Sequence, residues 1–140
     1  MILVTGSLAY DLIMNFPGRF SDHILADKIH NLNVSFLVEN LRQERGGCAA
    51  NIAYSLALLG VKPAILGVLG RDGGEYKKWL ASRGVDVSQL QISRSQPTAS
   101  AFIITDQADN QITGFYPGAM KEIKNLKFPA KGWSASGRKS

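Results

Sequence analysis

Apolar and polar positions in the first 60 residues follow two different periods. Ile2–Gly6 is a short, β-rich apolar run that stops at glycine, which predicts a buried strand ending in a loop. Alternation over Leu12–Phe16 and over Leu32–Val38 predicts two further strands, the second of them outside the main sheet. Over Ala49–Gly60 the period becomes helical, with small residues between the larger ones, and this predicts a closely packed helix.

The same alternation of strand and helix continues in the second half. Ala64–Leu69 is apolar throughout and predicts a buried strand, and Tyr76, Trp79 and Leu80 share one face of a helix that ends before Gly84. Two β-rich runs, 98–105 and 111–116, are joined by a turn-rich linker and predict a hairpin. We therefore expect an α/β fold with a mainly parallel sheet and additional antiparallel strands.

The net charge changes this picture only at the end of the chain. The 140 residues carry a formal charge of +5, but residues 1–120 hold ten basic and ten acidic side chains. The excess therefore lies in the last twenty residues, and 129–140 is expected to be a basic, flexible tail. A neutral body argues against a nucleic-acid partner.

Other classes are excluded by what the sequence lacks. No apolar stretch reaches the roughly 18 residues of a membrane span, and the N-terminus has no basic leader. Cys48 is the only cysteine, and the two histidines show no metal-ligand spacing. We expect a cytoplasmic protein with no membrane partner, no internal disulfide and no metal site.

Polar and glycine residues gather where the predicted strands end. Gly46 and Gly47 precede the first helix and Asn51 lies in its first turn, so free N–H groups and an amide could meet an oxygen-rich ligand. Asp11 follows the loop at Gly6-Ser7, where a carboxylate can accept hydrogen bonds from vicinal hydroxyls. Each residue also has a structural interpretation, as a glycine-rich helix entry or a turn carboxylate.

Two further features have both a structural and a functional interpretation. Asp72 could belong to a second ligand loop, although an N-cap for the helix that follows is the better interpretation. Phe102, Phe115 and Tyr116 could stack on a flat ligand, whereas aromatic residues in strands usually belong to a core.

A longer motif resembles a known family. The stretch RGGCAANIAYSLALLGVKPAILGVLG, from Arg45 to Gly70, resembles the N-terminal signature of the ribokinase-like (PfkB) carbohydrate and nucleoside kinases. TGSLAYD, FPGRFSDHIL, LNVSFLVENL and FYPGAM extend the similarity, which is greatest to bacterial adenosine kinases of ribokinase type. The resemblance implies the N-terminal part of a three-layer ribokinase-like α/β sandwich over 1–128, with a small β-stranded lid at about 28–45.

The resemblance also implies roles for individual residues. Asp11, Gly46, Gly47 and Asn51 would hold the hydroxyls of a ribose, with Ser7 nearby. Phe115 would be one wall against a nucleobase. The facing position, which is aromatic in the adenosine kinases, is Ala101 in this sequence, and Phe102 would point to the other side of its strand.

The implied activity is ATP-dependent phosphoryl transfer to a primary hydroxyl of a ribosyl-type sugar or nucleoside, with adenosine as one candidate. Family members run to roughly 300 residues, and their ATP and Mg²⁺ site and catalytic Asp lie around a G-A-G-D-like motif that this sequence lacks. We therefore expect no catalytic residue in this chain and no turnover by it alone. The alternatives are a non-catalytic sugar- or nucleoside-binding module and, less favoured, an interaction protein acting through its basic end. A homodimer through the lid strands is also expected.

Overall fold

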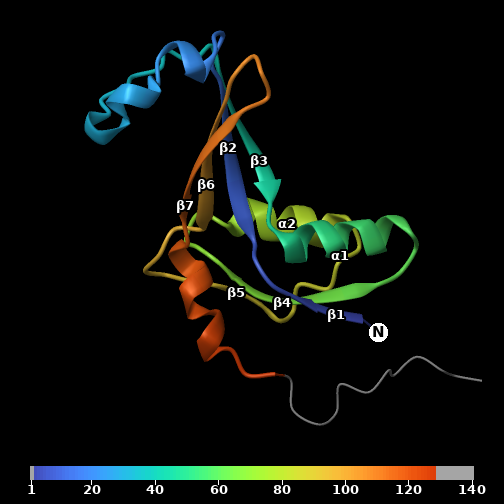
Figure 1. Cartoon of the computed structure of the whole chain (residues 1–140). Helices are drawn as coiled ribbons and strands as arrows, with labels where there is room; N and C mark the ends of the chain where they lie inside the picture. Colours follow the sequence, from blue (N-terminus) through green and yellow to red (C-terminus); the bar gives the residue numbers. More distant parts are fainter. Residues whose placement is uncertain (1, 129–140) are drawn as a thin grey trace, which may run out of the picture.

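Seven consecutive buried residues, Pro63–Leu69, form the central strand of a parallel sheet. The structure is a computed structural model that describes residues 2–128. In chain order its elements are β1 (Ile2–Thr5), β2 (Ala9–Asn15), the 3₁₀ helices η1 (Phe20–Asp22) and η2 (Ala26–Asn31), β3 (Asn40–Gly46), α1 (Cys48–Leu58), β4 (Pro63–Leu69), α2 (Gly74–Ser82), β5 (Leu90–Ile92), β6 (Ala99–Thr105), β7 (Gln111–Tyr116) and the 3₁₀ helix η3 (Gly118–Asn125) (Figure 1).

β4 pairs in parallel with β1 on one side and with β5 on the other. Helices α1 and α2 lie along one face of this sheet (Figure 1). The core between them is built from fully buried side chains that include Ala53, Ile65, Leu69, Tyr76 and Leu80. The predicted order of strand, helix, strand and helix is confirmed, and the parallel sheet is the expected result of that order.

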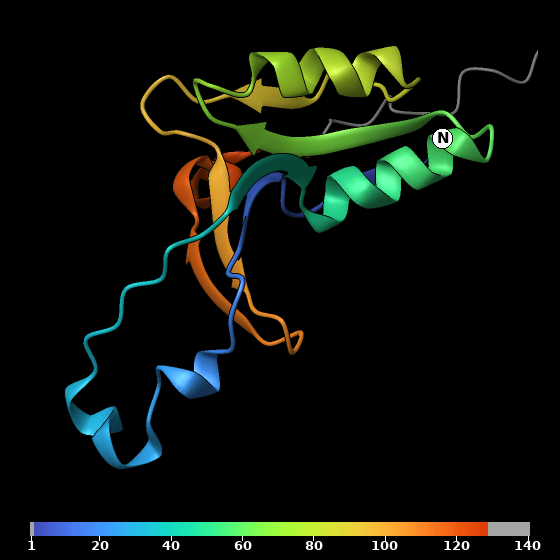
Figure 2. The same cartoon turned by 90° about the horizontal axis from the view of Figure 1, so that it is seen from above.

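A second sheet, with the order β3-β2-β6-β7, extends away from the helices. β2 and β6 run parallel, whereas β3 and β7 are antiparallel to their neighbours. Figure 2 shows this sheet projecting from the body, with η1 and η2 at its far end. The predicted hairpin of 98–105 and 111–116 is present as β6 and β7.

The predicted strand over Leu32–Val38 is wrong. Residues 32–38 belong to no strand within the described residues 2–128. Phe36 packs instead against Phe16 and Phe20, with ring centroids 4.8 and 5.0 Å apart. The alternation therefore reflects an extended segment with one drier side, which is held by aromatic packing and not by a β-ladder.

Asp72 does not cap α2, contrary to the interpretation favoured by the sequence. The N-cap position is Gly73, and no side chain bonds to that end of the helix. The Oδ1 atom of Asp72 instead accepts hydrogen bonds from the backbone N–H and the hydroxyl of Thr98, both at 2.7 Å. Asp72 therefore ties the loop after β4 to the start of β6, where the two sheets meet.

No helix within residues 2–128 combines the length and the apolar character needed to cross a membrane. The expected basic tail, 129–140, lies outside the described residues.

The far end of the second sheet is held by one carboxylate. Asp106 accepts hydrogen bonds from the backbone N–H groups of Phe20, Ala108 and Asn110, each at 2.9 Å, and from the side-chain amide of Asn110 at 3.1 Å. Burial raises the pKa of Asp106, but these hydrogen bonds outweigh it and bring the pKa down to about 2. Asp106 thus fastens η1 to the turn between β6 and β7.

We expect this attachment to be lost in acid. The pKa of Asp106 is about 2 in the folded chain against an ordinary value of 3.8, so its contribution to folding is present above 3.8 and disappears as the pH falls through about 2. As the pH is lowered, the NMR shifts of the Phe20 and Ala108 amides should change with a midpoint at about pH 2. Asp106→Asn, which cannot titrate, should remove the transition, and a midpoint near the ordinary value in the unmutated chain would contradict the expectation.

Candidate functional site

The candidate site lies where β3 passes into α1, beside the loop after β1. Ser7 organises this junction, because its Oγ accepts the Cys48 N–H at 2.9 Å and its carbonyl accepts the Ala49 N–H at 3.1 Å. Two N–H groups at the start of α1 are therefore satisfied by Ser7. The Ser7 hydroxyl keeps its own proton as a donor.

Gly46 lies directly beneath the carboxylate of Asp11. A Cβ atom on Gly46 would lie 2.3 Å from Asp11 Oδ2, a distance that no real side chain could occupy. Gly46 pairs with Ala9 across the β2–β3 ladder, two residues from Asp11 along the same strand. Only glycine at position 46 lets the Asp11 carboxylate rest against the backbone of β3.

Gly47 is required for a different reason. Its φ of +96° lies in the region that side chains rarely adopt, and a Cβ there would lie 2.4 Å from the Ser7 carbonyl oxygen. Gly47 therefore lets the chain leave β3 and begin α1 within one residue. The two glycines predicted as a flexible helix entry have separate structural tasks.

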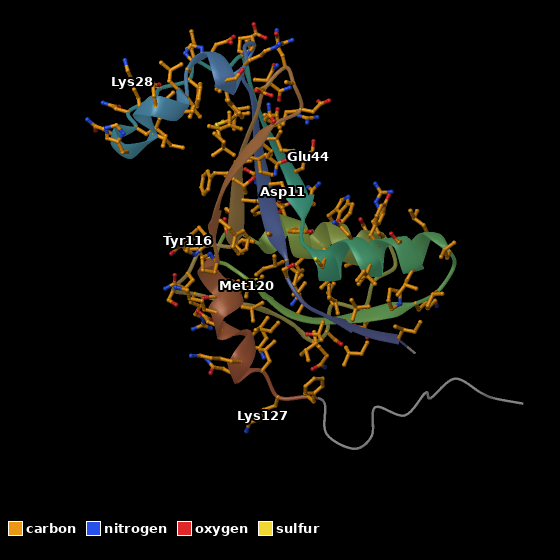
Figure 3. The ribbon with its side chains drawn as sticks, in the orientation of Figure 1. Asp11, Lys28, Glu44, Tyr116, Met120 and Lys127 are labelled. Carbon is orange, nitrogen blue, oxygen red and sulfur yellow. The ribbon has the colours of Figure 1, made fainter. Side chains whose placement is uncertain are left out.

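Asp11 is half buried and has a second carboxylate beside it. Burial raises the pKa of Asp11 above its usual value, and the charge of Glu44, its cross-strand partner, raises it further. Figure 3 shows both residues on the neighbouring strands β2 and β3. The two neighbouring carboxylates therefore give the site several hydrogen-bond acceptors.

One row of side chains crosses the second sheet through Asp11. The register aligns Glu44 with Asp11, Asp11 with Ala101, and Ala101 with Phe115. Partners in register point to the same face, so the row has carboxylates at one end, a small residue in the middle and an exposed aromatic ring at the other. Asp11 and Phe115 are two strand spacings apart, about 10 Å.

Phe102 is on the opposite face of β6, as the alternation of the strand requires. Asn51 is exposed in the first turn of α1, and its backbone N–H bonds to the Gly47 carbonyl at 3.1 Å. The structure thus brings Ser7, Asp11, Gly46, Gly47 and Asn51 to one junction. Phe115 lies farther along the sheet, at the other end of the row.

Sequence reasoning missed two residues at this junction. Glu44 lies two positions before Gly46 and therefore shares its face of the strand, but this signal is visible only once β3 is recognised as a strand. Tyr76 is predicted only to share one face of a helix with Trp79 and Leu80, and its hydroxyl donates a hydrogen bond to the Gly46 carbonyl at 2.7 Å. No sequence pattern connects α2 with that carbonyl.

Within residues 2–128, no three His, Cys, Asp or Glu side chains gather as a set that could hold a metal ion.

Comparisons with known proteins give this junction a context. A model of the pfkB family of carbohydrate kinases matches residues 1–136. A nucleoside kinase of Methanothermobacter thermautotrophicus is 31% identical over 131 residues, which are 92% of this chain and 39% of that protein. The chain thus spans about two fifths of the length of this curated relative.

Solved structures agree with the sequence comparison. The nucleoside kinase of Burkholderia thailandensis in complex with inosine superposes with a TM-score of 0.78 and 42% identity, over 90% of this chain and 39% of that one. The nucleoside kinase of Methanocaldococcus jannaschii, an archaeal member of the ribokinase family, gives 0.77 and 32%, over 91% and 40%. The expected ribokinase-like α/β architecture, present here as its N-terminal part, is confirmed.

Two glycines allow a matched test of the junction, because Gly47 has a positive φ and close neighbours whereas Gly74 has neither. Gly47→Ala is expected to lower the free energy of unfolding by about 2 kcal/mol or more, because it combines a positive φ with a clash against the Ser7 carbonyl. Gly74→Ala, at the start of α2 with nothing within 4 Å, should raise it by up to about 1 kcal/mol. Urea denaturation measures both. Equal effects would show that the geometry at Gly47 is unimportant.

Proposed function

Because the chain belongs to the pfkB family of carbohydrate kinases, we propose that it is the acceptor-binding and lid part of an ATP-dependent nucleoside kinase. The observation that carries this proposal is the row from Asp11 to Phe115, which begins at the junction of β3 and α1 and ends at an exposed aromatic ring. The whole protein would transfer a phosphoryl group from ATP to a primary hydroxyl of a ribosyl substrate.

The hydroxyls of the ribose would bind at the junction. The Asp11 carboxylate can accept hydrogen bonds from two vicinal hydroxyls, and the exposed Asn51 amide adds a donor and an acceptor. Because the N–H groups of Cys48 and Ala49 already bond to Ser7, recognition would depend on side chains and on the close approach that Gly46 and Gly47 permit.

The base would extend along the row toward Phe115. Ala101 adds little bulk between Asp11 and the aromatic ring, so a flat ring could lie over it and pack against Phe115. The similarity to a nucleoside kinase whose structure is known in complex with inosine supports a purine nucleoside. Adenosine, which the resemblance to adenosine kinases suggests, belongs to the same class.

The phosphoryl donor would bind elsewhere in the whole protein. This sequence contains no G-A-G-D-like motif, so ATP, Mg²⁺ and the catalytic base are assigned to the part of the family fold that this chain does not span. Residues 28–45 would contribute to the lid, joined to the body through β3. A lid excludes water from the transferring phosphate, and the junction positions the acceptor.

We also propose the homodimer that is expected through the lid strands, with the face of the second sheet opposite Asp11 as the contact between the two copies. Leu12, Phe102, Ile104 and Ile112 lie on the face opposite Asp11, and Phe102 and Ile112 are 46% and 43% exposed. Sedimentation equilibrium should give a dimer that Phe102→Asp dissociates. A monomeric unmutated chain would contradict the dimer without affecting the proposed acceptor site.

Binding and turnover together test the proposed function. Calorimetry should detect inosine or adenosine binding to the 140-residue chain, with no phosphoryl transfer when ATP and Mg²⁺ are added. Asp11→Asn should weaken binding by about ten- to a hundredfold, since a hydrogen bond to a charged group contributes roughly 1.5–3 kcal/mol.

Asp86→Asn, at an exposed position between α2 and β5, is the matched control and should leave binding unchanged. Tight binding that Asp11→Asn does not alter would contradict the assignment of the acceptor site. Binding without any phosphoryl transfer by a longer form of the protein would favour the non-catalytic nucleoside-binding module.

A further inference from the structure

We propose that Tyr76 is a positioning residue of the acceptor site: its hydroxyl holds the peptide between Gly46 and Gly47 in the orientation that nucleoside binding needs. The inference rests on the proposed function for the identity of the ligand. Its structural part, the control of the two glycines from α2, can be tested without any ligand.

Tyr76 reaches the junction from a distant part of the sequence. It is fully buried on α2, and its hydroxyl donates a buried hydrogen bond to the Gly46 carbonyl at 2.7 Å, thirty positions away in the sequence. Its ring packs against Tyr10 and Trp79, with centroids 5.5 and 6.1 Å apart. These contacts prevent the ring from following the backbone if Gly46 moves.

The bonded carbonyl belongs to the peptide that joins the two glycines. A peptide unit is planar, so fixing the Gly46 carbonyl also fixes the direction of the Gly47 N–H. Glycine has the widest backbone freedom of any residue, and two in succession leave this peptide with little local restraint. Together with the pairing of Gly46 with Ala9 and the bond from the Asn51 N–H to the Gly47 carbonyl, the hydrogen bond from Tyr76 therefore selects one orientation.

The restraint bears directly on Asp11. Its carboxylate rests against the Cα of Gly46, where even a Cβ atom would be only 2.3 Å from Oδ2. A rotation of the peptide after Gly46 would change the surface on which the carboxylate rests. Tyr76 thus acts on the ligand through Gly46 and Asp11, without touching it.

A second contact from α2 supports the same end of β3. The guanidinium of Arg45 lies over the Trp79 ring, 5.1 Å from its centroid. Trp79 follows Tyr76 by three positions and therefore lies on the same side of the helix. α2 thus holds both the last side chain of β3 and the first carbonyl of the diglycine.

Burial also keeps the Tyr76 hydroxyl in its donor form. The pKa of Tyr76 is raised well above its usual value by burial first, and then by the nearby Tyr10 and Asp11; Arg45 opposes this shift. The hydroxyl therefore stays protonated throughout the neutral range, and the restraint does not vary with pH there.

Tyr76→Phe in the full 140-residue chain removes the donor and keeps the ring. We expect NMR shifts of the Gly46 and Gly47 amides to change, hydrogen exchange around them to speed up at least tenfold, and inosine to bind roughly five- to tenfold more weakly. Incorporation of 4-aminophenylalanine at position 76 restores an N–H donor and should recover much of each effect.

Tyr10→Phe is the matched control. It removes a hydroxyl from the same pair of rings, but that hydroxyl bonds to the Asp72 carbonyl at 3.3 Å and not to the diglycine. Tyr10→Phe should leave the NMR shifts and exchange rates of the Gly46 and Gly47 amides unchanged, and the affinity for inosine as well. A uniform rise in exchange across the chain in Tyr76→Phe, or effects equal to those of Tyr10→Phe, would mean that Tyr76 has only a general packing role.

The two readouts separate the inference from the function on which it rests. If the NMR shifts and exchange rates of the Gly46 and Gly47 amides are unchanged in Tyr76→Phe, the positioning role is overturned, whatever the chain binds. If those shifts and rates change but the unmutated chain binds no nucleoside, the restraint is supported and the proposed ligand is contradicted. Changed amides with unaltered inosine affinity overturn the claim that the restraint serves binding.

Discussion

The contact between the Asp11 carboxylate and the backbone of Gly46 is the constraint on which the candidate site depends. The carboxylate occupies the space that a Cβ atom on Gly46 would need, so the contact requires glycine and a fixed register between β2 and β3. A shift of one residue in that register would turn Asp11 to the other face of the sheet. The position of the Asp11 oxygen atoms therefore follows from strand pairing.

The contact lies at the junction where the chain passes between the two sheets. The chain leaves the parallel sheet after β1, pairs β2 with β3, and returns to the helical layer through the positive φ of Gly47. At the point of return, Ser7 accepts hydrogen bonds from the first N–H groups of α1, and Tyr76 donates one to the Gly46 carbonyl. Segments far apart in the sequence therefore hold one short turn, and rigidity there comes from tertiary contacts because the glycines supply none.

Periodicity predicted the elements whose burial is one-sided or complete, including β4, α1 and the hairpin of β6 and β7. It missed β3, because NLRQERG is polar on both faces and all but Gly46 is exposed. It misjudged the segment around Phe36, since alternation records a drier side but not the presence of a partner strand. Asp11 and the diglycine were candidates from their places after predicted strands and received their proposed role from the family resemblance, whereas Glu44 and Tyr76 depend on register and on a contact between remote elements.

The arrangement suggests how the work of a kinase of this family is divided. Phosphoryl transfer requires an acceptor hydroxyl held in line with the donor, and holding a ribose by its other hydroxyls provides that alignment without any base nearby. In the proposed acceptor site, binding energy at Asp11 would be useful only if the backbone beneath the carboxylate kept its position when the nucleoside bound. A diglycine would yield unless it were restrained from outside. The buried hydrogen bond from α2 supplies that restraint, so the proposed acceptor site depends on the core of the parallel sheet as well as on the pairing of β2 with β3.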